Sequence, residues 1–82
     1  MAYYYRAMVY DAVGQYQQAI NDYENVVAQN PSIPLVYYSL GVDYDSLKIF
    51  TKAVENYKKF IELSKEENEY TNYARERIKQ SQ

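Results

Sequence analysis

The sequence predicts an all-α protein, an α-solenoid of two helix-turn-helix hairpins followed by a closing helix. Aromatic and small residues recur with a period of 34 residues, and apolar residues within each period are spaced three and four apart, as on one face of a helix. Turn-forming residues, Gly14 and two prolines, fall between the apolar segments. We therefore expect a single domain over residues 1–82, with repeats at residues 1–33 and 34–67 and a capping helix at residues 68–82.

The period rests on identical residues that align when the chain is shifted by 34 positions. The aligned pairs are Tyr3 and Tyr37, Tyr4 and Tyr38, Tyr10 and Tyr44, Asp11 and Asp45, Ala19 and Ala53, and Tyr23 and Tyr57. Chance rarely aligns so many aromatic residues. We therefore interpret the two segments as copies of one structural unit.

The first hairpin is expected to comprise a helix at residues 2–13, a turn at 14–15 and a helix at 16–29. Gly14 suits this turn because glycine readily takes the left-handed conformation that ends a helix. The prolines that follow stop the second helix, and Pro34 suits the first turn of the next one.

The second hairpin repeats the plan except at its turn. Lys48 stands where Gly14 stands in the first hairpin, so this helix end is expected to be either less sharply defined or slightly strained. The closing helix has one apolar stripe and a polar back, which predicts a lid on the last hairpin. The stripe consists of Tyr70, Tyr73, Ala74 and Ile78.

Small and aromatic residues at matching positions predict how each hairpin packs. Alanine or glycine on both helices would allow a close approach, and large rings beside them would fill the remaining space. The rings expected in the interior are Tyr10, Tyr23, Tyr44 and Tyr57. The chain has twelve Tyr, two Phe and no Trp, and tyrosine suits a thin domain because its ring packs while its hydroxyl stays available for water or a partner.

Composition excludes several classes of function. The chain has neither Cys nor His, which excludes disulfides, thiolate nucleophiles, imidazole bases and the usual zinc ligands, so no cofactor or metal is expected. A net charge of −2 does not favour nucleic acid. No apolar run approaches the roughly 18 residues of a membrane span, and no signal peptide is evident. We expect a cytoplasmic protein without membrane contact.

Catalysis is not expected either. The chain has only two glycines and no glycine-rich phosphate loop. Asp11 and Asp45 are equivalent residues on neighbouring repeats, and stacked helices lie roughly 8–10 Å apart, too far for the two carboxyl groups to share a proton.

One motif in the second unit resembles a known family. It reads Tyr37-x-x-Leu40-Gly41-x-x-Tyr44, followed by Ala53-x-x-x-Tyr57. This motif resembles the tetratricopeptide repeat, with Tyr in place of the leading Trp and of the later Phe. The first unit matches less fully, because Arg6 stands at a position that is normally a buried Leu. The resemblance covers roughly residues 2–65 and implies a right-handed superhelix with a capping helix.

The resemblance implies a concave groove that receives a peptide or protein segment. Its implied lining is Tyr4, Tyr5, Met8, Asp11 and Ala12 from the first repeat, Tyr38, Ser39, Val42, Asp45 and Ser46 from the second, and Asn72, Tyr73 and Glu76 from the closing helix. The aspartates would favour Lys or Arg on a ligand. A branch of the family clamps a C-terminal carboxylate with basic side chains, and this sequence does not match it.

Other interpretations of these residues stay open. Tyr4 and Tyr38 could stack on each other as part of the packing between repeats, and Asp11 and Asp45 could be solvated surface charges. The function predicted from sequence is non-catalytic protein binding. The alternative is a structural unit, either part of a longer array or a building block that self-associates through its N-terminal edge, where Met1 lies close to the groove tyrosines.

Overall fold

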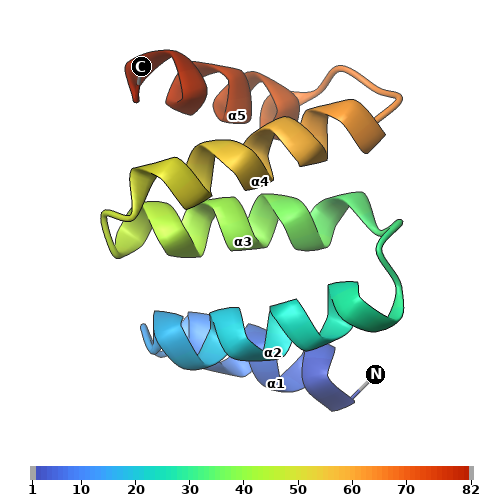
Figure 1. Ribbon diagram of the computed structural model, residues 1–82, viewed down its shortest axis with the longest axis vertical. Helices are drawn as coiled ribbons and strands as arrows, with labels where there is room; N and C mark the ends of the chain where they lie inside the picture. The colour runs from blue at the N-terminus through green and yellow to red at the C-terminus, as the bar shows by residue number, and fades with distance from the viewer. Residues whose placement is uncertain (1, 82) are drawn as a thin grey trace.

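The computed structural model describes residues 2–81, and this part of the chain contains five helices (Figure 1). Their bounds are α1 Ala2–Ala12, α2 Tyr16–Gln29, α3 Pro34–Ser46, α4 Phe50–Leu63 and α5 Glu69–Gln80. α1 packs against α2 and α3 against α4 as two hairpins, α2 packs against α3, and α5 lies against α4. The predicted all-α architecture and the order of the helices are confirmed.

Both hairpin turns use the same backbone geometry. Gly14 has a φ of 79° and Lys48 a φ of 62°. In each turn the amide of the next residue donates a hydrogen bond to a tyrosine carbonyl of the preceding helix, at 2.8 Å in the first turn and 2.9 Å in the second. Left-handed backbone costs a non-glycine residue about 1 kcal/mol. Of the two outcomes expected at this helix end, backbone strain at Lys48 is the one that the structure shows.

The loop before α5 is held by a capping box. The Asn68 side chain accepts a hydrogen bond from the Thr71 amide at 3.1 Å, and the Thr71 hydroxyl accepts one from the Asn68 amide at 2.8 Å. Thr71 is buried against the rest of the chain. These bonds satisfy amide groups that a helix start leaves without partners, and they fix the position of the first turn of α5.

The core lies within the hairpins and between neighbouring helices. Its buried apolar members are Ala7, Ala19, Ile20, Tyr23, Val36, Tyr37, Leu40, Ala53, Tyr57, Phe60 and Ala74. Gly41 allows the closest approach, because an added Cβ at this position would lie 2.6 Å from Cδ1 of Tyr57. The predicted role of small residues between the helices of a hairpin agrees with this contact.

Two of the four expected interior tyrosines are less buried than predicted. Tyr23 and Tyr57 are almost fully buried, whereas Tyr10 and Tyr44 are half-buried. The hydroxyl of Tyr44 reaches the surface and donates to Glu24 at 3.2 Å. The prediction is wrong for Tyr10 and Tyr44, because their helical positions lie at the edge of the core.

Arg6 is tolerated because it does not enter the core. Its guanidinium donates two hydrogen bonds of 2.8 Å to the Asp22 carboxylate, and its side chain stays 57% exposed while that of Asp22 is 4% exposed. The hydrogen bond with Arg6 lowers the pKa of Asp22. Arg6 therefore compensates a carboxylate that would otherwise be buried without a partner.

α5 forms the predicted lid through a narrower face than expected. Thr71 and Ala74 are buried, but Tyr70 and Tyr73 remain almost half exposed. Their rings turn towards Tyr38 of α3, with centroid distances of 5.2 Å and 6.2 Å. These two tyrosines therefore belong to the inner face of the solenoid as much as to the core.

Candidate protein-interaction groove

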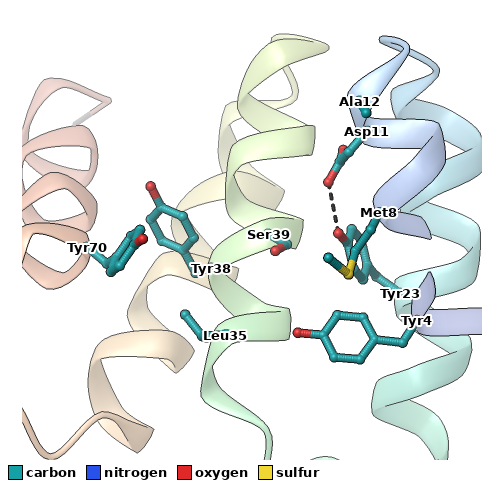
Figure 2. A pocket seen from close by; sticks show the side chains of 9 residues that line it. All are labelled: Tyr4, Met8, Asp11, Ala12, Tyr23, Leu35, Tyr38, Ser39 and Tyr70. Atoms are coloured by element: carbon teal, nitrogen blue, oxygen red, sulfur yellow. Dashed lines mark hydrogen bonds between the residues drawn. The ribbon is translucent and has the colours of Figure 1, made fainter. Parts of the chain in front are cut away.

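Two adjacent cavities open along α1, α3 and α5. The first has a volume of about 460 Å³, and Figure 2 shows its lining. The second, of about 520 Å³, shares Tyr4, Leu35 and Tyr70 with the first and extends to the loop between α4 and α5. We call these two cavities together the groove. A third cavity, of about 290 Å³, lies between α3 and α5 and is called the side cavity.

The thirteen residues implied by the family resemblance fall into three groups. The groove is lined by Tyr4, Met8, Asp11, Ala12, Tyr38 and Ser39. The side cavity is lined by Val42, Asp45, Ser46 and Tyr73. Outside these three cavities, on exposed positions, lie Tyr5, Asn72 and Glu76. Contact of any of them with a partner stays a prediction.

Tyr38 joins the groove wall to the core. Its ring lies 5.2 Å from that of Phe60 and 6.3 Å from that of Tyr57, besides its contacts with α5. Tyr4 instead meets Tyr23 edge to face at 6.2 Å, on the opposite side of the groove (Figure 2). The two groove tyrosines therefore pack within their own halves, and the interpretation that they stack on each other is wrong.

Asp45 is not a solvated surface charge. Its carboxylate accepts hydrogen bonds from Nε and Nη2 of Arg77 at 2.6 Å and 2.7 Å, and from the Tyr57 hydroxyl at 3.2 Å. The side chain of Asp45 is only 10% exposed. Its acceptor sites are largely occupied by the chain itself, which leaves little capacity for a ligand.

Asp11 is held at the groove by a single hydrogen bond to a side chain. The Tyr23 hydroxyl donates to Asp11 Oδ2 at 2.9 Å (Figure 2). The other oxygen, Oδ1, is buried without a hydrogen-bond partner in the described residues. The interpretation of Asp11 as an ordinary solvated charge is therefore also wrong.

Asp43, on α3, lies beside Asp11 of α1 where the second hairpin packs on the first. It is 1% exposed, and its Oδ2 has no hydrogen-bond partner among residues 2–81. Burial raises the pKa of Asp43 to about 9, with a further contribution from a hydrogen bond and charge repulsion involving Asp11. At neutral pH the raised pKa therefore favours the protonated form of Asp43.

Sequence reasoning missed Leu35 and Asp43 and assigned Tyr70 only to the lid. Leu35 is 49% exposed and lines both cavities of the groove. A signal for it existed, because it precedes Tyr38 by three positions and so lies on the same helical face. The signal for Asp43 was its alignment, by the 34-residue period, with the apolar Val9.

Comparison with known proteins identifies the family. Models of the tetratricopeptide repeat match residues 1–33 and 35–67. The chain belongs to the tetratricopeptide repeat family. It is similar to tetratricopeptide repeat protein 6 of Homo sapiens, with 29% identity over 65 residues that make up 79% of this chain and 12% of that protein. No solved structure matches the chain.

Membership of this family indicates a protein-interaction module in general, and the family is generally non-catalytic. Within residues 2–81, none of the helices combines the length and the apolar character needed to cross a membrane. In the same residues, no group of three or more acidic side chains is gathered as a metal site would require.

Proposed function

We propose that this chain holds a segment of another polypeptide in the groove, as a non-catalytic interaction module. The observation that carries the proposal is the clustering of exposed apolar side chains there. Met8 and Leu35 are each 49% exposed and Tyr70 is 44% exposed, and all three line the groove. Apolar surface gathered in a concave site is typical of binding sites, since burial against a partner removes it from water.

The shape of the groove supports a peptide as its occupant. Its two cavities have volumes of about 460 and 520 Å³, which suits a few side chains of a bound segment. Tyrosine rings on both walls provide contact area at low entropic cost, because each ring has only two torsions to order. Tyr4 is held by Tyr23 and Tyr38 by the core, so both walls are ordered before a partner arrives.

Selection from a displayed library of short random peptides, with the full chain as bait, tests the proposal. Leu35→Glu should weaken the selected peptides at least about 10-fold, because it places a charge on the apolar floor of the groove. The fold should be retained, since the Leu35 side chain is half-exposed. Calorimetric titration measures the affinity and circular dichroism checks the fold.

Val9→Glu is the matched control. Val9 is also an exposed apolar residue on a helix, and it lines none of the three cavities. The Val9→Glu variant should leave peptide affinity unchanged. Equal losses in the two variants, or failure of the library to yield any binder, would contradict binding in the groove.

A structural unit is the second candidate, favoured by the outer face of α1. Asp43 lies on the buried face with which α3 docks on the first hairpin, and the 34-residue period aligns it with Val9. With Tyr5 of α1 and Val13 of the turn that follows, Val9 forms an exposed apolar stripe. This stripe corresponds to the face that would dock on a preceding repeat or a second copy of the chain.

The stripe differs from the N-terminal edge predicted from sequence. Met1 lies outside the described residues, and Tyr4 and Met8 line the groove. Sedimentation equilibrium tests self-association through the stripe: the wild type should associate and Val9→Glu should stay monomeric. A wild-type monomer at high concentration would contradict this second candidate.

A further inference from the structure

The chain has two junctions: the first lies between the two hairpins, and the second lies between the second hairpin and α5. Both contain the same hydrogen bond from a tyrosine to an aspartate, and a third residue lies beside each aspartate. We call these three residues the framework of a junction. A shift of 34 residues aligns Tyr23 with Tyr57 and Asp11 with Asp45. In each pair the tyrosine hydroxyl donates to Oδ2 of the aspartate, at 2.9 Å in the first junction and 3.2 Å in the second. Each aspartate is thereby oriented in the same way at the inner face of the solenoid.

The third member of the framework differs between the junctions. The same shift aligns Asp43 with Arg77. At the second junction, the Arg77 guanidinium completes the framework by donating to both oxygens of Asp45 at 2.6 Å and 2.7 Å. At the first junction the corresponding residue is a carboxylic acid, so the Asp11 carboxylate has no cation beside it among the described residues.

Two oxygen atoms at the first junction show that hydrogen-bond donors are missing there. Asp11 Oδ1 and Asp43 Oδ2 are both buried and lack a hydrogen-bond partner in residues 2–81, and Asp43 is 1% exposed. Burial favours the protonated form of Asp43, and the groups that face Asp43 from the other elements are Asp11 on α1 and Tyr23 on α2. A neutral acid donates one hydrogen bond, whereas a guanidinium donates two parallel ones.

The groove gives a ligand access to this junction. Asp11 lines the cavity of about 460 Å³ beside Ala12 and Ser39, and Figure 2 shows its carboxyl group between α1 and α3. The second cavity of the groove shares Leu35 with the first and extends towards the loop before α5. A peptide lying in the groove could extend a long side chain to Asp11.

We propose that the first junction is a subsite for an arginine side chain of the peptide held in the groove, which pairs with Asp11 as Arg77 pairs with Asp45. The proposal rests on the proposed function of the groove and names the chemistry of its partner. The ion pair at the second junction is the internal template for the contact. Asp43 is buried and lines none of the three cavities, but a positive charge placed beside Asp11 should still make the Asp43 proton easier to remove.

Carbon-detected NMR of the full, uniformly labelled chain tests the subsite without a known partner. The probe is N-acetyl-arginine amide, added to about 100 mM at constant ionic strength because a single side chain binds in the millimolar range or weaker. N-acetyl-citrulline amide, which has nearly the same shape without the charge, is the control probe. The carboxyl carbons of Asp11 and Asp43 report binding.

The arginine probe should shift both carboxyl resonances saturably and lower the pKa of Asp43, while the citrulline probe should do neither. Asp11→Asn should abolish the response. Equal responses to both probes, or shifts confined to exposed carboxylates such as Glu24, would overturn the subsite. An unchanged Asp43 titration at saturating probe would do the same.

A chain variant provides a second test. Asp43→Arg places a guanidinium at the position equivalent to Arg77, so it should raise the melting temperature and remove the response to the arginine probe. A folded Asp43→Arg chain that still responds as the wild type does would overturn the proposal. If this variant fails to fold, the wild-type titration alone decides.

The two proposals fail in distinguishable ways. If selected peptides lose affinity with Leu35→Glu but the arginine probe does not shift Asp11, the groove binds peptides and the subsite is wrong. If the probe shifts Asp11 but no peptide is selected, the first junction binds an isolated arginine side chain, and both the groove proposal and the assignment of the subsite to a bound peptide are wrong.

Discussion

Replacing Asp43 by Asn should remove a pH dependence that the stability of the wild-type chain shows near neutrality. The pKa of Asp43 is about 9 in the folded chain, and about 3.9 is expected for Asp in an unfolded chain. Between these values the folded state binds one more proton than the unfolded state. The free energy of unfolding therefore falls as pH rises, by up to about 1.4 kcal/mol per pH unit.

The sign and size of this effect follow from the raised pKa. The contribution of Asp43 to stability is fully present below about pH 4, and it is lost as pH rises through about 9. Between about pH 6 and 8 the loss is up to about 2.7 kcal/mol. A chain of this size has a total stability of only about 5–10 kcal/mol, so the change is easily measured.

Urea denaturation followed by circular dichroism, at several pH values from about 5.5 to 8.5, gives the slope. The chain has no His and no Cys, so no other side chain with an ordinary pKa titrates in this range. Asp43→Asn keeps the size of the side chain and its ability to donate to Asp11. Its stability should be independent of pH in this window.

Asp22→Asn is the matched control. Arg6 lowers the pKa of Asp22, so the contribution of Asp22 is present above about pH 4 and is lost only as pH falls below that range. Asp22→Asn should lower stability throughout the neutral window and retain the wild-type slope. A flat wild-type profile, or an equal slope in Asp43→Asn, would refute the raised pKa of Asp43.

Three further predictions concern the scaffold, and urea denaturation measures each. Gly41→Ala should lower stability by about 1–2 kcal/mol, because overpacking against Tyr57 outweighs the helix-propensity gain of about 1 kcal/mol; an unchanged midpoint would refute the close contact. Lys48→Gly should raise stability by about 1 kcal/mol and Gly14→Ala should lower it by a similar amount; changes of the same sign would contradict the shared turn geometry. Deletion of residues 68–82 should cost several kcal/mol by exposing the core that α5 covers; an unchanged midpoint would show that α5 is not a lid.

Local pattern sufficed to predict the helices. Apolar spacing and the position of Gly14 placed the ends of the first hairpin within one residue of the observed bounds, because both depend on neighbours in the sequence. Strain at Lys48 was one of the two outcomes predicted there, for the same reason. Burial of whole side chains was harder to predict, and Tyr10 and Tyr44 show this: their spacing is that of core residues, but they lie at its edge.

The groove was partly predicted because the repeat places equivalent residues on one face. Tyr4, Met8 and Tyr38 line it, as the family resemblance implied. Leu35 was missed because it lies in a continuous apolar run at the start of α3, where several faces are apolar at once.

The sequence by itself determined the helices, the repeat and the family, since these depend on short-range spacing and on a period that the chain displays twice. Only the tertiary structure determined which carboxyl groups are solvated, paired or protonated. Asp45 of the second repeat meets Arg77 of the capping helix, and Asp11 of the first repeat lies beside Asp43 of the second. Whether a carboxylate is solvated, paired or protonated depends on burial and on partners far along the chain, and the energy of a buried charge changes by several kcal/mol with that environment. The same residue type at equivalent positions therefore forms an ion pair with Arg77 at one junction and lies beside the buried Asp43 at the other.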